Sequence, residues 1–166
     1  MKKLYAPWRS KYTNHNSTSD KANTDMPCVF CQHVASTDDQ KNFIIKRFKH
    51  CFVMLNLHPY NAGHCMVLPY KHSESLDLLT SEIRAEIMEV TSQAITVIRQ
   101  VLKSDAVNMG INLGKAAGGS IPDHLHIHIL PRWWGDTNFL ATLADTKSIV
   151  LDLHEVYRSL CAAFGS

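Results

Sequence analysis

The sequence predicts an α+β fold in which an antiparallel sheet of about five strands is covered by one long helix and a shorter C-terminal helix. Short runs of β-branched and aromatic residues, separated by polar or turn-forming residues, indicate the strands. A single long segment with helical periodicity lies between the first three runs and the last two. The length of 166 residues suits one domain, which we place at 28–166. Residues 1–27 lack periodicity and are expected to form a partly mobile N-terminal arm.

Three strands are predicted in the first half of the chain, at 43–45, 51–55 and 64–68. Each run is apolar and rich in β-branched or aromatic residues, and a polar segment or a Pro/Asn/Gly turn separates it from the next. We therefore expect three successive antiparallel strands.

The most regular segment is a helix predicted from Thr80 to about Lys103. Its apolar positions recur at alternating steps of four and three, which places them on one stripe that packs on the sheet: Ile83, Ile87, Val90, Ala94, Val97 and Val101. Beyond this helix, 107–113 and 124–130 alternate with the period of two that is typical of strands. The apolar spacing of 153–160 predicts the terminal helix.

Composition excludes several classes of protein. The 17 Lys and Arg residues nearly balance the 15 Asp and Glu residues, so the electrostatic footprint of a dedicated nucleic-acid binder is absent. The basic start of the chain is not followed by an apolar stretch, so we expect no signal peptide, no membrane anchor and a cytoplasmic location. Thiols stay reduced in that compartment, and Cys51, Cys65 and Cys161 are interpreted as core residues.

The last predicted strand carries a histidine at every second position. Because alternate strand residues share a face, His124, His126 and His128 point one way and the apolar residues between them point toward the helices. A solvated face explains one histidine, but three in register form a row of groups that titrate near neutrality. Two chemical interpretations are open: a shared Zn²⁺, or a nucleophilic imidazole whose neighbours act as acid and orienter.

A loop of small residues, 114–120, precedes this row. Its backbone N–H groups can approach phosphate oxygens, and Lys115 adds positive charge, although a simple hairpin turn is an alternative. Next to the histidines the loop favours a phosphoryl substrate. Trp133 and Trp134 follow the row and are candidates to stack on a purine, but adjacent residues of an extended chain point to different sides.

The alternating run at 124–130 resembles the signature of the histidine-triad (HIT) superfamily of nucleotide hydrolases and transferases. Further similarity lies at 60–64, 69–72 and 131–139. The last of these segments, together with 6–9 and 28–31, resembles the branch that contains diadenosine tetraphosphate phosphorylases and hydrolases. The resemblance runs from about Tyr5 to Phe139 and implies that 28–166 form a single HIT-like catalytic domain.

The resemblance implies a covalent mechanism. The middle histidine of the family attacks the α-phosphorus, so His126 is the expected nucleophile and a nucleotidyl-histidine the intermediate. His128 matches the third histidine, which contacts the α-phosphate and the bridging oxygen, and an imidazolium there would supply a proton to the departing oxyanion. His64 matches a further active-site histidine; its alternative is a buried strand residue bonded to backbone.

The resemblance also implies a set of nucleotide-binding residues. Asn56 lies where relatives carry a residue that contacts the ribose, and Asn112 matches a polar residue near the phosphates. Gly119 belongs to the paired glycines of the phosphate loop. Ser120 follows them where several relatives have glutamine, which is a departure from the family pattern in the part of the site that binds phosphate.

Cys28 and Cys31 have the C-x-x-C spacing that presents two thiolates to one tetrahedral ion, but two ligands do not complete a structural site. The resemblance implies that His72 and His124 complete it, which would make His124 an anchor for the neighbouring nucleophile. The alternatives are a metal-free pair of thiols and a redox motif, and the second is disfavoured because no βαβ pattern surrounds the pair.

The expected function is cleavage of dinucleoside polyphosphates, with diadenosine tetraphosphate as the expected substrate and water or phosphate as the acceptor. The alternatives are hydrolysis of nucleoside phosphoramidates or aminoacyl-adenylates, a nucleotide-binding module without turnover, and a metallohydrolase with zinc on the triad. Zinc is the expected structural metal, and Mg²⁺ is expected only as a companion of the polyphosphate. The resemblance implies a homodimer. The charge balance and the lack of an apolar stretch predict neither nucleic acid nor membrane as a partner.

Overall fold

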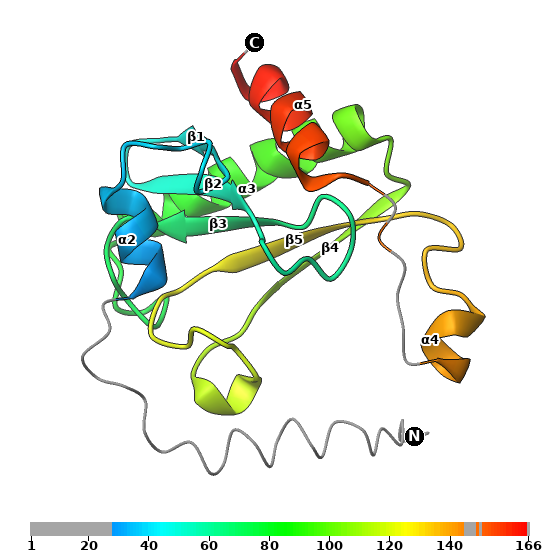
Figure 1. Cartoon of the computed structure of the whole chain (residues 1–166). Helices are drawn as coiled ribbons and strands as arrows, with labels where there is room; N and C mark the ends of the chain where they lie inside the picture. The colour runs from blue at the N-terminus through cyan, green and yellow to red at the C-terminus, as the bar shows by residue number, and fades with distance from the viewer. Residues whose placement is uncertain (1–27, 145–148, 150, 166) are drawn as a thin grey trace.

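The computed structural model describes residues 28–144, 149 and 151–165, so the N-terminal arm expected at 1–27 lies outside the described residues (Figure 1). The elements, labelled as in Figure 1, are α2 (Val29–Ala35), β1 (Ile44–Arg47), β2 (Cys51–Leu55), β3 (Cys65–Pro69), α3 (Ser81–Leu102), β4 (Ala106–Ile111), the 3₁₀ turn η1 (Lys115–Ala117), β5 (Ile127–Arg132), α4 (Phe139–Leu143) and α5 (Leu153–Gly165). The predicted α+β class is confirmed, with five strands in one antiparallel sheet of this described part.

The strand order β1-β2-β3-β5-β4 places β5, which carries part of the histidine row, inside the sheet. The chain leaves β3, crosses the sheet through α3, forms the edge strand β4 and then returns between β3 and β4. Strand β5 therefore pairs on both sides, and His128 lies directly opposite Met66 of β3 and Gly110 of β4. A strand paired on both sides holds its side chains in a fixed register.

Helix α3 begins and ends where the sequence pattern indicated. The Thr80 hydroxyl accepts a hydrogen bond from the backbone N–H of Ile83, and Lys103 ends the helix in the left-handed conformation with φ 51°. The buried stripe departs slightly from the prediction, because Ile98 is fully buried whereas Val97 and Val101 are half-buried. Helix α3 packs against β2, β3, β5 and α5.

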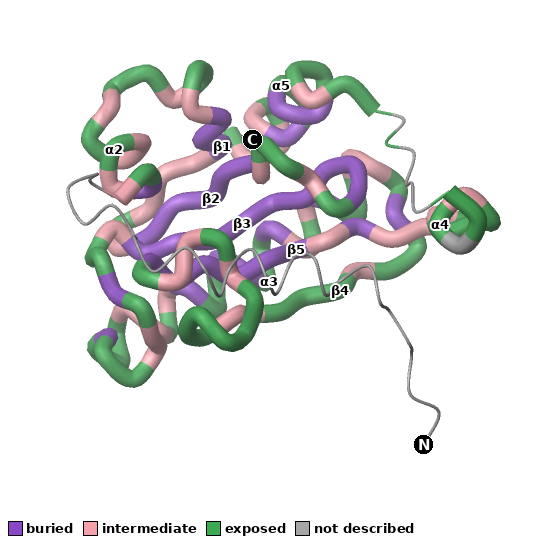
Figure 2. The backbone as a smooth tube through the Cα atoms, turned by 60° about the horizontal axis from the view of Figure 1, so that its bottom comes forward, coloured by how far each residue is buried: buried purple, intermediate pink, exposed green. Residues whose placement is uncertain are grey.

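Hydrophobic residues cover both faces of the sheet. The larger cluster lies between the sheet and helices α3 and α5. On the opposite face, α2 contributes Phe30 to a second cluster of the residues Ile44, Phe52, Met54, Met66 and Leu68. Strands β2 and β3 are consequently buried along their whole length, as Figure 2 shows. The sequence did not indicate α2, which is only seven residues long.

The three remaining cysteines lie in the hydrophobic core or pack against it. Cys51 and Cys65 are fully buried, and the half-buried Cys161 packs against the larger cluster, so their interpretation as core residues is confirmed. In the described part of the chain, no helix is both long and apolar enough to cross a bilayer.

Candidate active site and metal cluster

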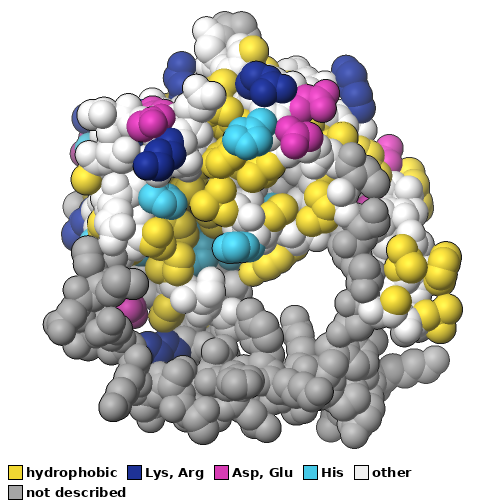
Figure 3. All heavy atoms as spheres, viewed as in Figure 1, with side chains coloured by type: hydrophobic (Ala, Val, Ile, Leu, Met, Phe, Trp, Pro, Cys, Tyr) yellow, Lys and Arg dark blue, Asp and Glu magenta, His cyan; other side chains and the backbone are white. Residues whose placement is uncertain are grey.

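The histidine row alternates as predicted, but it is buried. Leu125, Ile127 and Ile129 belong to the cluster under α3, while the histidines occupy the face that α2 covers. His124, His126 and His128 are exposed by 0%, 5% and 7%, so the simple alternative of a solvated face is wrong. Buried imidazoles need partners for their nitrogens, and those partners define the chemistry of each ring. In Figure 3, histidine side chains lie among hydrophobic ones on the face toward the viewer.

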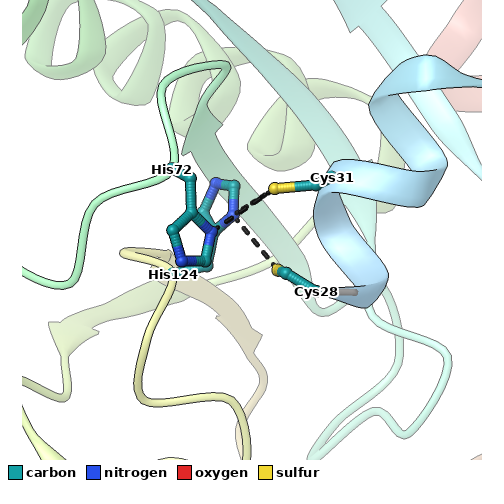
Figure 4. Close-up of side chains that lie close together, drawn as sticks. All are labelled: Cys28, Cys31, His72 and His124. Atoms are coloured by element: carbon teal, nitrogen blue, oxygen red, sulfur yellow. Dashed lines mark hydrogen bonds between the residues drawn. The ribbon is translucent and has the colours of Figure 1, made fainter. Parts of the chain in front are cut away.

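The first histidine of the row lies beside three other candidate metal ligands. Cys28 and Cys31 come from the start of α2, His72 from the loop after β3, and His124 from the segment before β5 (Figure 4). One ligand atom from each of the four lies within 4.8 Å of all the others. The structure thus brings together the four residues that were predicted from the family resemblance.

The spacing within this cluster fits a tetrahedral ion. With Zn–S bonds of about 2.3 Å and Zn–N bonds of about 2.0–2.1 Å, a tetrahedral site separates sulfur from nitrogen by about 3.6 Å. The His124 Nδ1 lies 3.4 Å from the Cys28 sulfur and 3.6 Å from the Cys31 sulfur, and the His72 Nδ1 lies 3.4 Å from the Cys31 sulfur. The donor types and their separations can hold a metal ion.

Two further observations favour a cation at this position. Burial and the neighbouring Cys28 raise the pKa of Cys31, so two thiolates side by side require a positive charge to stabilise them. The His124 Nε2 lies 3.0 Å from the Pro69 carbonyl oxygen, which leaves Nδ1 as the ligating nitrogen and fixes the ring plane. His124 is therefore suited to bind metal rather than to react.

The middle histidine has one nitrogen occupied and one available. The His126 Nδ1 lies 2.7 Å from the carbonyl oxygen of His124, so Nδ1 carries the proton and donates it to that carbonyl. Nε2 then holds a lone pair, and among the described residues no group forms a hydrogen bond to it. The ring is held between Phe30 at 5.4 Å and His128 at 4.7 Å, measured between ring centroids. A ring nitrogen with an available lone pair can act as a nucleophile.

The third histidine is paired with His64, which immediately precedes β3. The His64 Nε2 lies 2.9 Å from the His128 Nδ1. The backbone N–H of Tyr60 donates to the His64 Nδ1 at 3.2 Å, so that nitrogen is an acceptor and the His64 proton lies on Nε2. His64 then donates to His128, whose own proton lies on Nε2. That His128 nitrogen is buried and has no partner within the described part of the chain.

Burial keeps both rings of this pair neutral. Desolvation, followed by the charges of the neighbouring histidines, lowers the pKa of His64 to about 3 and that of His128 to about 4. The imidazolium expected at His128 is therefore replaced by a neutral ring. A neutral imidazole still donates through Nε2–H, so the ring retains the capacity to protonate a leaving group.

The triad geometry agrees with the comparisons with known proteins. The family profile described as "HIT domain" matches residues 37–133, and the chain is 36% identical over 99% of its length to a Mycobacterium tuberculosis protein named "AP-4-A phosphorylase", covering 85% of that protein. The chain belongs to the HIT family. The family and the branch that the sequence resembles are thereby confirmed, and so is the expected class of enzyme, a HIT-family nucleotidyl transferase or hydrolase.

More distant HIT proteins are similar over less of the chain. A Saccharomyces cerevisiae protein named "Adenosine 5'-monophosphoramidase HNT1" is 26% identical over 73% of this chain and 72% of its own length. Among solved structures, a "ZN-bound histidine triad family protein" from Mycobacterium smegmatis superposes with a TM-score of 0.69 at 30% identity, over 84% of this chain and 94% of that chain.

The predicted nucleotide-binding residues of the HIT domain lie on two sides of the row. Asn112 follows β4, and its Cβ is 3.6 Å from the position that a Cβ on Gly119 would take, so these two residues meet as expected. Ser120 is exposed, and Ile121 after it packs against the cluster that contains Phe30. Asn56, in contrast, follows the last residue of β2. Its side-chain nitrogen lies 3.3 Å from the His64 Nδ1, and its side-chain oxygen accepts from the backbone N–H of His58 at 2.9 Å.

The paired tryptophans of the HIT domain point to different sides, as the alternation of an extended chain predicts. The half-buried Trp133 donates its indole N–H to the Leu102 carbonyl at 3.3 Å, whereas Trp134 is 92% exposed. Both line a cleft of about 390 Å³ at the end of β5, together with Asp105, Arg132 and their neighbours.

Two features of the site were not found from the sequence. Phe30 packs edge-on against His124 at 5.6 Å, and its position between the two cysteines of C-x-x-C was the only signal.

Asp136 accepts hydrogen bonds from Arg132 at 2.6 and 2.8 Å and from the Asn61 amide at 2.8 Å. It thus connects the loop that precedes His64 to the end of β5, and the i,i+4 spacing of Arg132 and Asp136 was its signal.

Proposed function

We propose that this HIT domain cleaves dinucleoside polyphosphates, with diadenosine tetraphosphate as the preferred substrate, through a nucleotidyl group on His126. The observation that carries the proposal is the pair of complementary nitrogens on neighbouring rings. His126 offers a lone pair on Nε2, and His128 offers an unpartnered proton on Nε2. A nucleophile next to a proton donor is the arrangement that displacement at phosphorus requires.

In the first step, the lone pair of His126 Nε2 attacks the α-phosphorus and forms a P–N bond. The bond from that phosphorus to the bridging oxygen breaks, and the oxygen takes its electron pair. The proton on His128 Nε2 moves to that oxygen as ATP departs. Throughout this step, the carbonyl of His124 accepts a hydrogen bond from the Nδ1–H of His126. This hydrogen bond stabilises the positive charge that develops on the attacking ring.

In the second step, an acceptor attacks the same phosphorus and the P–N bond breaks, which returns the electron pair to His126. Inorganic phosphate as acceptor yields ADP, and water yields AMP. The basic His128 Nε2 left by the first step receives the proton of the acceptor. One site therefore supports both outcomes, and the identity to "AP-4-A phosphorylase" favours phosphate.

Product analysis tests this proposal. Purified protein is incubated with diadenosine tetraphosphate, with and without inorganic phosphate, and nucleotides are separated by chromatography. We expect ATP and ADP when phosphate is present. ATP and AMP in both reactions would assign the enzyme to hydrolysis and contradict the phosphate acceptor, and absence of turnover would leave a nucleotide-binding module.

The nucleophile is tested by replacing His126 with Gly. Turnover should fall to background while nucleotide affinity changes little, because the missing interaction forms only along the reaction path. Lys41→Ala, at an exposed residue between α2 and β1 and outside the proposed site, serves as a control for nonspecific damage. Activity of the Gly variant at the wild-type level would refute the assignment.

We further propose that Asn112, Gly119 and Ser120 bind the phosphates of the substrate. The proximity of Asn112 to Gly119 supports this role, as does the contact of Ile121 with the cluster beside the triad. Ser120 donates one hydroxyl proton where glutamine donates two amide protons. Ser120→Ala should raise KM for the tetraphosphate more than it lowers kcat.

The ion proposed for the cysteine and histidine cluster is zinc, held by Cys28, Cys31, His72 and His124. Two thiolates with two imidazoles at tetrahedral spacing are a closed set, which is typical of structural zinc. A bound zinc ion would supply positive charge to the thiolates and would link α2 to the segment before β5. The carbonyl of His124 orients the nucleophile through its contact with His126 Nδ1.

We also propose a cytoplasmic homodimer. The edge strand β4 is largely exposed, including Met109 at 48%, and an open edge with apolar side chains is a pairing surface. Sedimentation equilibrium should give twice the monomer mass, and a monomer at micromolar concentration would contradict the dimer.

A further inference from the structure

The protonated nitrogen of His128 is determined by a chain of hydrogen bonds that begins at Asn56. The Asn56 side-chain amide lies 3.3 Å from the His64 Nδ1, and the backbone N–H of Tyr60 lies 3.2 Å from the same nitrogen. Both donors therefore meet at Nδ1, the ring nitrogen of His64 that does not face His128. His64 continues the chain to His128 at 2.9 Å.

The orientation of the Asn56 amide follows from its second hydrogen bond. Its Oδ1 accepts from the backbone N–H of His58 at 2.9 Å, and a backbone N–H can only donate. The amide group facing His64 is therefore the NH₂ donor. The turn that follows β2 thus fixes which end of the asparagine His64 meets, and this removes the usual ambiguity between oxygen and nitrogen.

Two donors directed at the His64 Nδ1 exclude a proton from that nitrogen. If His64 carried its proton on Nδ1, that N–H would face the N–H groups of Asn56 and Tyr60 without an acceptor between them. The lone pair of the ring would then lie on Nε2, which faces His128. His128 would then have to donate from Nδ1, and its Nε2 would present a lone pair to the bridging oxygen of the substrate. The lone pair of His128 Nε2 would face a lone pair of the bridging oxygen, and the departing group would receive no proton.

We propose that Asn56 is a positioning residue that, acting through His64, holds the His128 proton on Nε2 and so makes His128 a proton donor. This inference rests on the proposed role of His128 in catalysis. It assigns Asn56 a task other than the ribose contact that the family resemblance implies. The fully buried His64 acts through its neighbour and does not meet the substrate.

The surroundings of the relay admit few other proton partners. The Tyr60 ring packs at 4.7 Å on His64 and at 5.8 Å on His128, and covers both. His126 contacts His128 at 4.7 Å, but its Nδ1–H is directed at its own strand. The tautomers therefore depend on the donors at the Asn56 end.

Asn56→Asp is the sharpest test because it is nearly isosteric. The carboxylate keeps one oxygen for the His58 N–H, so the turn is retained, and it replaces the NH₂ donor with an acceptor. A carboxylate draws the imidazole proton onto the nitrogen that it faces, as in the Ser-His-Asp triad. At about pH 8, the His64 proton should move to Nδ1 and the His128 proton should follow it. Asn108→Asp adds the same charge on β4 and keeps its acceptor for Arg132, so it is the matched control.

Nitrogen-15 NMR of the imidazoles measures these tautomers without turnover. In the wild type, the protons of His64 and His128 should both lie on Nε2, and in the Asn56→Asp variant both should lie on Nδ1. Signals are assigned with His64→Gln and His128→Gln variants. A wild-type His128 protonated on Nδ1 would overturn the inference, and so would an Asp variant with unchanged tautomers.

Kinetics then separates proton donation from a general structural effect. Adenosine 5'-phosphoromorpholidate has an amine leaving group that requires a proton, whereas p-nitrophenolate leaves adenosine 5'-(p-nitrophenyl phosphate) without one. We expect Asn56→Asp to slow the morpholidate about 10²-fold and the nitrophenyl ester less than about 3-fold, because only the first needs general acid catalysis. Equal losses on both substrates would assign Asn56 a merely structural role.

The failure of the proposed function is distinguishable from the failure of this inference. If the wild type turns over neither substrate, the catalytic role is wrong, while the NMR spectra still report whether Asn56 sets the tautomers. If the wild type is active but the spectra or the leaving-group ratio do not respond, Asn56 is not the positioning residue.

Discussion

Replacing Gly63 with Ala is expected to destabilise the protein and to reveal how tightly the turn before His64 is packed. Gly63 has φ +71°, in the left-handed region that residues with a Cβ rarely adopt. A Cβ at this position would overlap Leu102 Cδ1 at the end of α3 and would lie 3.3 Å from Pro131 Cγ in β5. The turn is therefore enclosed by the end of α3 and by β5.

The magnitude has two parts. A left-handed conformation costs an alanine about 1–2 kcal/mol relative to glycine. Inserting a methyl group into a filled space costs about 1–3 kcal/mol more, toward the lower value if the Leu102 side chain can shift. The expected loss is about 2–5 kcal/mol of unfolding free energy. Gly118→Ala is the matched control, since Gly118 is left-handed, with φ 88° and ψ 15°, and no atom lies within 4 Å of its added Cβ, which leaves only the first part.

Urea denaturation of the wild type, both alanine variants and Leu102→Ala measures these terms. The Gly63 variant should lose about 1–3 kcal/mol more than the Gly118 variant. Combining Gly63→Ala with Leu102→Ala should recover part of that excess, because the smaller side chain makes room for the methyl group. Equal losses at Gly63 and Gly118, with no recovery in the double variant, would refute the packing argument.

Three further predictions concern the metal cluster, the buried histidines and the Asp136 network. Chelation should lower the melting temperature of the wild type, since a ligand present at about 1,000 times its Kd stabilises the folded state by about 4 kcal/mol. The melting temperature of Cys31→Ser should not respond to the chelator, and unchanged melting of the wild type would count against a structural ion. Burial holds the pKa of His64 at about 3 and that of His128 at about 4, whereas both titrate near 6.5 when unfolded, so the unfolded chain binds more protons below that value. The two buried rings therefore cost no unfolding free energy above about pH 6.5, and the unfolding free energy falls below that pH, by about 2 kcal/mol per histidine at about pH 5. In urea unfolding, His64→Gln should lose less unfolding free energy between these pH values than the wild type, and an equal loss would contradict this cause. Asp136→Asn keeps the shape but weakens the bonds to Arg132, so we expect a loss of about 1–3 kcal/mol in thermal unfolding at neutral pH, and no change would mean that solvent screens the pair.

Elements with strong periodicity were predictable from the sequence. The apolar spacing between Ile83 and Val101 fits only a helix, and Thr80 caps the N-terminus of that helix. The histidine row was equally clear, because a period of two places the histidines on one face whatever the rest of the fold does. The four metal ligands came from the family resemblance, since two cysteines alone leave the other two positions open.

Features that depend on long-range packing were not predictable. Helix α2 is too short to be stable by itself, so its position over the row depends on contacts of Phe30 with distant histidines. The burial of His124 and His126 depends on that cover, whereas the Tyr60 ring covers His64 and His128. The role of Asn56 depends on which end of an amide faces a ring, and that is decided by a single backbone bond in the following turn.

The run from His124 to Ile129 uses its odd and even positions for different tasks, and this makes it intolerant of insertion. One residue added between His126 and Ile127 would put the two halves of the run out of phase. With β5 held by its pairing, His124 and His126 would enter the hydrophobic interior and Leu125 would take the opposite face. A frame error of that kind would destroy folding and chemistry together. Protein engineers who wish to alter specificity should therefore vary loop lengths on either side of this run and leave its parity intact.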